Sequence, residues 1–367
     1  MSEQKGNETF WKRRWKVVLN VVTVCALIAL VYAIRHDIVQ TFKNLADIKA
    51  WVLLLMIPIQ FLNYDAQARI YKSLFKLEGT QVDYWQIMRA TLELNFVNHV
   101  FPSGGVTGIS YFSLRLKNFG VNIAKATAAH MLKLILVFLS FELLIVIAVV
   151  ALAIGGHINN VVLLLAGSLV TSVIFITGAM AFIIGSKQRI SGFFAYIMMW
   201  VNKFVRMFRR DKSDVVNVDK VRGLFEEMHE YYVQFSRDWR RLNGALFWAF
   251  MANMWEVMTI VIVYVAFGNM VNIGAIILAY AVANFAGFVS ILPGGVGVYE
   301  ALMTLMLSAT GVPSRLSIPV TITYRIVNTL IQVPAGYIAY QLYIHRLKPT
   351  EKEKFEDLVE GDDESRI

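Results

Sequence analysis

The stretch Ser290–Glu300 reads S-I-L-P-G-G-V-G-V-Y-E and places a Pro-Gly-Gly break inside an apolar run. A second stretch, F-P-S-G-G-V-T-G-I-S at Phe101–Ser110, repeats this arrangement in the first half of the chain. Proline removes a backbone donor and glycine frees the dihedral φ, so each stretch should end one helix and begin another. Such bare backbone is tolerated at membrane depth where it lines a cavity. The two stretches therefore predict two re-entrant broken-helix hairpins, around residues 101–108 and 292–300.

The amino-acid composition is that of a membrane protein. Hydrophobic residues make up 57% of the 367 residues, which is more than a soluble domain usually contains. A formal net charge of +9 would suggest nucleic acid as the partner of a soluble chain, but no basic and aromatic surface module accompanies it. We assign this charge to cytoplasmic loops that face anionic lipid headgroups. The single cysteine, Cys25, excludes an intramolecular disulfide and a cysteine metal cluster, and we expect neither a metal nor a cofactor.

The first half of the membrane region is expected to cover residues 17–155. Residues 1–16 form a basic N-terminus, and an apolar run of about 18 residues follows, which is enough to cross a bilayer. Apolar residues at helical spacing in 35–49 predict a short helix in the membrane interface. Longer helices are expected at 51–75, 84–100 and 123–154, and the first hairpin lies between the last two.

The second half is expected to cover residues 156–347. Its helices are predicted at 161–185, 246–267 and 317–344, and the second hairpin joins the apolar stretches 273–292 and 296–310. A polar segment, 187–241, is predicted to form cytoplasmic interfacial helices, and the charged tail 348–367 is predicted to be disordered. The fold class is therefore an all-α polytopic membrane protein with about eight hydrophobic segments, namely about six full spans plus the two hairpins.

The distribution of basic residues predicts the topology. With both termini in the cytoplasm, 29 of the 35 Lys and Arg residues fall in cytoplasmic segments and four fall in outer loops. The two hairpins then enter from opposite sides, and the two halves form an inverted-topology repeat. Repeats of this kind with broken helices at the bilayer midplane are typical of alternating-access transporters. We expect a multi-pass protein of the cell inner (cytoplasmic) membrane.

Two basic residues stand inside apolar helices at similar distances from the two breaks. Lys133 follows Gly105 by 28 residues, and Arg325 follows Gly295 by 30 residues. An ionised side chain at a helix centre costs about 2.5–3.5 kcal/mol on insertion scales, so such groups usually face a cavity or one another. One interpretation is that both cations hold an anionic lipid headgroup, aided by the helix N-termini that follow the breaks. The other is that they form buried ion pairs, such as Lys133 with Glu256.

For Arg325 the corresponding ion-pair interpretation is a bond to Glu300.

The sequence lacks the motifs of common phosphate-binding and metal-binding sites. The chain contains no G-x-x-x-x-G-K-[ST] phosphate loop, no H-E-x-x-H and no Cys/His metal spacing. Transport would then be passive or ion-coupled.

The motifs resemble those of a known family. L-P-G-G-V-G-V-Y-E at 292–300, T-Y-R-I-V-N at 323–328 and F-P-S-G-G-V-T-G at 101–108 are similar to the lysylphosphatidylglycerol synthase/flippase transmembrane family. The resemblance covers about Val17–Leu347. In the bifunctional members, known as multiple peptide resistance factor, a soluble aminoacyl-transfer domain follows and makes the lipid that the membrane part moves. Only about 20 polar residues follow here, so the resemblance does not imply synthase activity.

By this resemblance, Gly294, Gly295, Gly297, Glu300 and Arg325 match the second motif. The first motif departs from the family pattern, because Gly-Val-Thr-Gly-Ile-Ser stands where an acidic residue often follows the glycines. The candidate substrate-binding residues are Arg325, Lys133, Gly294, Gly295, Gly297, Glu300, Gly104 and Gly105. Structural or coupling roles are assigned to Pro102, Pro293, Glu256 and Glu142.

The leading hypothesis is a flippase-like transporter that moves a phosphate-bearing lipid, of the phospholipid or prenyl-phosphate type, between leaflets. One alternative is an integral-membrane transferase acting on a lipid-linked substrate, for which His99 with Glu93 would supply the base. Another is an accessory subunit of an envelope enzyme. We expect membrane lipids with anionic headgroups as partners and a transporter rather than an enzyme; the sequence leaves a homo-oligomer open.

Overall fold

The computed structural model describes most of the membrane region. The described ranges are 48–77, 79–100, 106–156, 160–189, 239–289 and 297–346, with a few residues between 190 and 238. The expected first span, the interfacial helix at 35–49 except its last two residues, and the tail lie outside them. Both breaks also lie outside, and with them the candidate residues Pro102, Gly104, Gly105, Pro293, Gly294 and Gly295. The predicted turns of the two hairpins are therefore not described.

The first half consists of helices in every described element. They are η1 (Ala50–Leu55), α3 (Met56–Leu77), α4 (Tyr84–Val100), α5 (Val106–Lys117) and α6 (Ile123–Ile154). Pro58 lies in the first turn of α3, where proline is tolerated better than in a helix interior. Asn122 caps α6, because its side chain accepts a 2.8 Å hydrogen bond from the backbone N–H of Ala124. These local signals begin the helices close to the predicted residues.

The described elements of the second half are also helices. They are α7 (Asn160–Ile184), η2 (Trp239–Leu242), α10 (Asn243–Ala266), α11 (Ile273–Val289), α12 (Val298–Ala309) and α13 (Ser314–Arg346). Two prolines, Pro319 and Pro334, lie inside α13, which continues through both of them. In membrane helices, neighbouring groups can satisfy the carbonyls that proline leaves without a donor.

Three helices in the described ranges are long and apolar enough to cross a membrane. Their apolar regions are Ile123–Ile154, Val162–Ala179 and Arg240–Ala266. Shorter apolar helices occupy Ile273–Phe285 and Val298–Ala309. The remaining long helices, α3 with 22 residues and α13 with 33, are more polar. The protein is thus an all-helical integral membrane protein with three clear apolar spans in the described part, where the sequence predicted about six in all.

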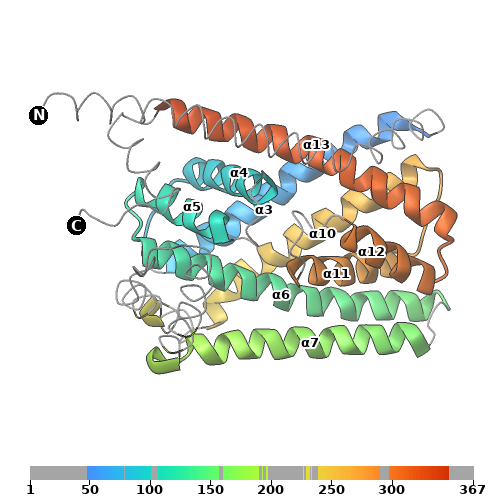
Figure 1. Cartoon of the computed structure of the whole chain (residues 1–367), viewed down its shortest axis with the longest axis horizontal. Coiled ribbons are helices and arrows are strands. Elements are labelled where there is room, and N and C mark those ends of the chain that lie inside the picture. The colour runs from blue at the N-terminus through green and yellow to red at the C-terminus, as the bar shows by residue number, and fades with distance from the viewer. Residues whose placement is uncertain are drawn as a thin grey trace, which may run out of the picture.

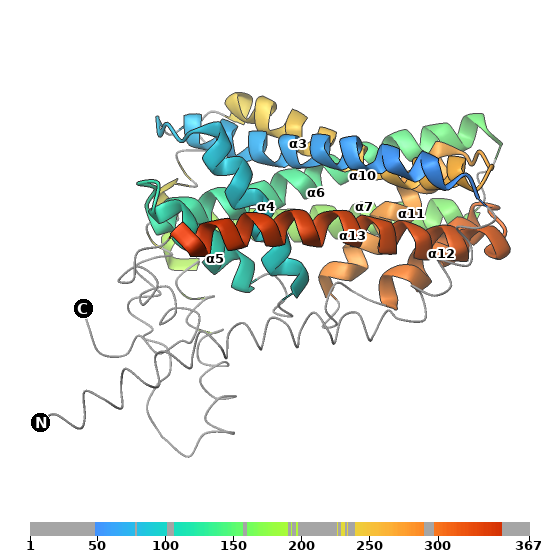
Figure 2. The ribbon, with the colours of Figure 1, turned by 90° about the horizontal axis from the view of Figure 1, so that it is seen from above.

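The helices form an elongated bundle in which α3 and α10 pack together, crossing it obliquely in Figure 1 and lying along one face of it in Figure 2. Helix α4 packs against α5, and α11 packs against α12. In Figure 1 the first of these pairs occupies one end of the bundle and the second pair occupies the opposite end. Each pair also contacts a long helix of the other half, since α4 lies along α13 and α11 lies along α6.

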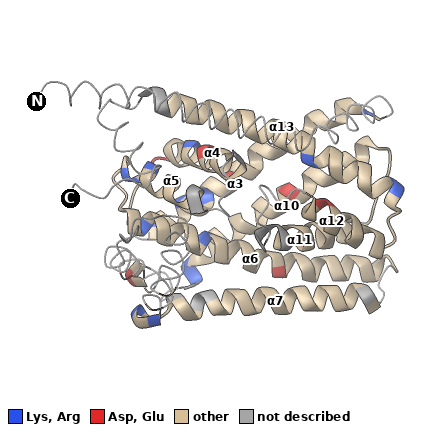
Figure 3. Cartoon of the chain, viewed as in Figure 1, with Lys and Arg blue, Asp and Glu red and all other residues tan. Residues whose placement is uncertain are grey.

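Charged residues are distributed unevenly along the bundle. Lys and Arg gather at the end where α5 finishes and α6 begins, whereas the opposite end has few of them (Figure 3). Most of the acidic residues of the membrane part lie nearer the middle. This distribution agrees with the asymmetry of basic residues counted along the sequence.

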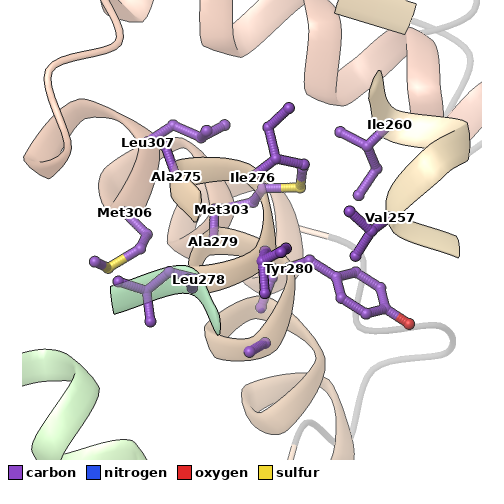
Figure 4. Close-up of a cluster of buried hydrophobic side chains, with 14 of the residues drawn as sticks. Val257, Ile260, Ala275, Ile276, Leu278, Ala279, Tyr280, Met303, Met306 and Leu307 are labelled. Atoms are coloured by element: carbon purple, nitrogen blue, oxygen red, sulfur yellow. The ribbon is translucent and has the colours of Figure 1, made fainter. Parts of the chain in front are cut away.

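Two clusters of buried apolar side chains hold the helices together. One cluster joins α3, α4 and α5 to the first turns of α6, and the other joins α10, α11 and α12 to the second half of α6. Figure 4 shows part of the second cluster, in which Met303 and Leu307 of α12 meet Ala275 and Ile276 of α11. In a bilayer such contacts stabilise by close packing, because lipid tails are as apolar as the side chains.

Glycines allow α13 to approach α4 closely and α11 to approach α6 closely. A Cβ atom at Gly336 of α13 would lie 2.6 Å from the Cβ of Phe96 and 2.7 Å from the carbonyl oxygen of Leu92, both on α4. A Cβ atom at Gly274 of α11 would collide with the carbonyl oxygen of Ala148 on α6. The contacts of α4 with α13 and of α11 with α6 therefore depend on small residues.

We expect Gly336→Leu to destabilise the protein by about 1–3 kcal/mol, because the added side chain overpacks the contact between α13 and α4. Thermal unfolding of the detergent-solubilised full chain measures the effect as a lower Tm. Gly178→Leu is the matched control, since a Cβ atom at Gly178 of α7 meets no atom within 4 Å. Equal Tm values for the two variants would contradict the close approach.

Candidate functional site

Arg325 of α13 and Glu300 of α12 form an ion pair. The Nε atom of Arg325 lies 3.3 Å from Oε1 of Glu300, and each side chain is 20% exposed. The guanidinium also lies over the ring of Tyr299, with its Cζ atom 4.5 Å from the ring centroid. Arg325 is thus held by a carboxylate and an aromatic face, and it stays partly accessible.

Glu300 has a second contact at the beginning of α12. Its Oε2 atom accepts a 2.7 Å hydrogen bond from the backbone N–H of Gly297. Gly297 has φ of 87°, a left-handed conformation that glycine adopts without steric cost. The sequence predicted an anion-binding helix N-terminus after the second break, and Glu300 itself supplies the anion there. The carboxylate of Glu300 therefore contacts both the guanidinium of Arg325 and the N-terminus of α12.

Lys133 of α6 lies in a different environment. Its side chain is buried, the Nζ atom donates a 3.0 Å hydrogen bond to Oε1 of Gln67, and the same atom lies 4.8 Å from the centroid of the Tyr71 ring. No carboxylate in the described ranges lies within ion-pair distance of this ammonium group. The pair of Lys133 with Glu256 that the sequence suggested is wrong, because Lys133 faces α3 instead.

Polar side chains on one face of α3 continue from Lys133 to α10. Gln67 donates a 2.7 Å hydrogen bond to Oδ1 of Asn63, whose amide nitrogen donates a 2.8 Å bond to the carbonyl oxygen of Ala252. Tyr71, one turn further along α3, bonds Nδ1 of His130 at 2.8 Å. The sequence reading missed Asn63 and Gln67, although their spacing of four residues, continued by Tyr71, places all three on one helix face.

Glu256 of α10 interacts with α13. The hydroxyl of Tyr324 donates a 2.7 Å hydrogen bond to Oε1 of Glu256, and the amide of Asn328 donates a 2.6 Å bond to the same oxygen. Both donors belong to the motif T-Y-R-I-V-N, in which the sequence reading assigned a role to Arg325 alone. Tyr324 and Asn328 lie on the α10 side of α13, while Arg325 contacts α12. Glu142 of α6, the other candidate carboxylate, has a buried Oε1 atom without a hydrogen-bond partner in the described part of the chain.

The helix pair α4–α5 contains a buried ion pair. Nε of Arg115 lies 2.7 Å from Oε2 of Glu93, and their side chains are 9% and 1% exposed. The hydroxyl of Tyr111 donates a 2.8 Å hydrogen bond to the same carboxylate oxygen. His99 instead pairs its Nδ1 with the carbonyl oxygen of Asn95 at 2.8 Å. The sequence proposed His99 with Glu93 as a catalytic base, and the structure gives these two residues different partners.

Replacing Glu93 alone should destabilise the protein by about 3–5 kcal/mol, because Glu93→Gln leaves the charge of Arg115 buried without its partner. The double variant Glu93→Gln with Arg115→Gln should recover part of the lost Tm. Glu230→Gln is the control, since its bond to Lys187 is exposed and its loss should leave Tm unchanged. A Tm for Glu93→Gln equal to that of the control would contradict a buried pair.

Comparison with known proteins gives a consistent result. The profile of the lysylphosphatidylglycerol synthase transmembrane region matches residues 17–336. A UPF0104 membrane protein of Methanocaldococcus jannaschii is 20% identical over 331 residues, which cover 88% of this chain and 93% of that protein. A UPF0104 membrane protein of Pyrococcus horikoshii is also 20% identical over 331 residues, covering 88% and 96%. One from Methanothermobacter thermautotrophicus is 25% identical over 159 residues, covering 40% and 48%.

Proposed function

The chain belongs to the lysylphosphatidylglycerol synthase transmembrane-region family, and from this premise we propose that it moves a phosphate-bearing lipid between the leaflets of the membrane. The lipid would be of the phospholipid or prenyl-phosphate type, since both carry a phosphate at the edge of an apolar chain. The membrane would be the inner membrane of the cell, with both chain ends in the cytoplasm. The asymmetry of Lys and Arg supports this orientation.

The observation that carries the proposal is the buried ammonium group of Lys133. It lies in α6, a helix that is long and apolar enough to span the bilayer, and the described residues offer it one amide oxygen and one aromatic face. An ammonium at membrane depth is stabilised by an opposite charge, and charged residues in such positions mark substrate paths. A lipid phosphate would supply that charge.

Arg325 is the second cation that we assign to the headgroup. Its planar guanidinium can bind phosphate through two parallel hydrogen bonds and stays charged when water is removed. Glu300 lies 3.3 Å from Nε of Arg325, and both side chains are 20% exposed. We propose that the phosphate and Glu300 compete for Arg325, so that binding of the lipid releases the N-terminal end of α12.

We propose that the two halves of the chain are inverted-topology repeats whose re-entrant hairpins enter from opposite sides. The reciprocal packing supports this, because α4 of the first half lies along α13 and α11 of the second half lies along α6. In Figure 1 the pair α4–α5 and the pair α11–α12 lie at opposite ends of the bundle, as expected for hairpins that enter from opposite sides. Rocking of one half against the other would expose the cations to each leaflet in turn.

The full chain in proteoliposomes tests the function. A fluorescent phosphatidylglycerol is placed in one leaflet, and its appearance in the other is followed with a membrane-impermeant quencher. A fluorescent neutral glycolipid with the same acyl chains reports on transfer that does not require phosphate. We expect the protein to accelerate transfer of phosphatidylglycerol over both the glycolipid and protein-free vesicles. Equal rates in vesicles with and without protein would overturn the proposal.

A further inference from the structure

Glu256 is a carboxylate without a positively charged neighbour. In the described part of the chain no Lys, Arg or His lies within ion-pair distance of it, and Arg325, next to its partner Tyr324, bonds Glu300 instead. Helix α6 also packs against α10, yet Lys133 there bonds Gln67. The two basic residues of η2, Arg240 and Arg241, lie at the far end of α10, about four turns away. The hydrogen-bond donors to Glu256 in the described part of the chain are thus neutral groups.

Neutral polar groups near Glu256 come from four other helices. Besides Tyr324 of α13, they include the buried hydroxyl-bearing side chains of Tyr64 on α3, Tyr280 on α11 and Tyr299 on α12. The hydrogen bonds from Tyr324 and Asn328 both reach Oε1 of Glu256, and the amide of Gln60 on α3 faces the same carboxylate. A proton on Oε2 therefore leaves the bonds from Tyr324 and Asn328 in place.

Among the described residues, several buried polar atoms around Glu256 have no hydrogen bond of good geometry. They are both amide atoms of Gln60, the hydroxyls of Tyr64 and Tyr299, and Oδ1 of Asn328. Gln60 is 1% exposed and Tyr64 is 3% exposed, so lipid and bulk water do not reach them. Buried polar groups are normally satisfied, so unpaired donors and acceptors around one carboxylate allow its hydrogen bonds to change.

The chemistry of the site points to a proton. In the ionised state Tyr324 and Asn328 both donate to the carboxylate, whereas the neutral acid carries an O–H that can donate to a nearby acceptor such as Oδ1 of Asn328. The reaction is the addition of one H⁺ from one aqueous side to Glu256 and its release to the other, with no change in oxidation state. Neutralisation also removes the cost of a charge at membrane depth.

We infer that Glu256 binds and releases a proton during each transport cycle and so couples lipid movement to proton movement. The coupling rests on the proposed function, while proton binding by Glu256 does not. Tyr324, Arg325 and Asn328 occupy one turn of α13, so a change in the bonds to Glu256 acts on the turn that carries Arg325. Proton binding at Glu256 and headgroup binding at Arg325 would then be energetically coupled through helix α13.

Infrared difference titration tests proton binding directly on the detergent-solubilised full chain. We expect a carboxylic-acid C=O band that grows as pH is lowered and that is missing in Glu256→Gln, an isosteric variant that keeps the acceptor for Tyr324 and Asn328. Glu230→Gln is the matched control, because Glu230 is exposed and its bond to Lys187 lowers its pKa. A titration identical in wild type and Glu256→Gln overturns the inference.

Transport measurements test the coupling. In vesicles with a pH gradient, wild-type protein should shift the labelled phosphatidylglycerol toward one leaflet, and its rate should change about tenfold over a few pH units. Glu256→Gln should abolish both effects, and Glu230→Gln should retain them. A shift driven by a Na⁺ gradient, with no effect of pH, would overturn the proton assignment. Absent lipid transfer in a protein whose Glu256 band titrates would overturn the proposed function and leave the proton site standing.

Discussion

Arg325→Gln should lower the rate of phosphatidylglycerol transfer by about 10- to 100-fold in a protein that still folds. This range corresponds to the loss of one charge-assisted hydrogen bond to phosphate, about 1.5–3 kcal/mol. Arg325→Lys should be partly active, because lysine keeps the charge but replaces the planar fork by a point charge. Arg315→Gln is the control, since Arg315 is an exposed arginine at the beginning of the same helix. The measurements are leaflet exchange in proteoliposomes and Tm in detergent.

The double variant Arg325→Gln with Glu300→Gln separates headgroup binding from a structural ion pair. If Arg325 only stabilised Glu300, removal of both charges would restore transfer as well as Tm. Because each side chain is 20% exposed and Glu300 keeps its bond to Gly297, we expect Arg325→Gln alone to change Tm little. The double variant should stay inactive. Recovery of transfer in it would contradict the binding role of Arg325.

Lys133→Gln should abolish most lipid transfer and leave Tm unchanged or raise it. The stability effect follows from the surroundings of Lys133, because removing a buried charge that has no carboxylate partner in the described part relieves a desolvation cost. The transfer effect follows from the lost attraction for phosphate, about 10-fold or more. A glutamine at this position can still bond Gln67.

Opposite signs for stability and transfer distinguish a binding residue from a structural one. Lys117→Gln, at the exposed end of α5, is the matched control and should change neither quantity. A variant Lys133→Gln that loses both Tm and transfer would assign Lys133 to the framework of the bundle. Wild-type transfer in a stable Lys133→Gln protein would remove Lys133 from the lipid path.

Helix positions could be predicted from the sequence where capping and composition act locally. The predicted bounds of α4 and α6 agree with the structure, since Asn122 caps the beginning of α6 and glycines follow its end. The beginning of α3 differed, because Ala50–Leu55 forms a tighter 3-10 helix and the regular helix begins at Met56. The repeat interpretation used only spacing and charge, which say nothing about packing between distant helices.

Partners across helices were harder to predict, because they depend on how helices cross. The pair of Arg325 with Glu300 was one of two interpretations that the sequence left open. The partners of Lys133 and Glu93 were not predicted, since each has several opposite charges at comparable sequence distance, and the rotation of the helix selects among them. Tyr324 and Asn328 belong to the same sequence motif as Arg325, but only the structure shows that both donate hydrogen bonds to Glu256.

The reciprocal packing of the helix pairs has a consequence for biogenesis. Helix α4 emerges from the ribosome early, yet Phe96 contacts Tyr337 and Tyr340, which are among the last membrane residues to be synthesised. Until α13 is inserted, the face of α4 that it covers has no native neighbour, so the first half cannot complete its tertiary structure during translation. Contacts between segments so distant in the chain form slowly. Insertion of α13 is thus the step that closes the fold, and a chain truncated before it would expose this face to quality-control proteases.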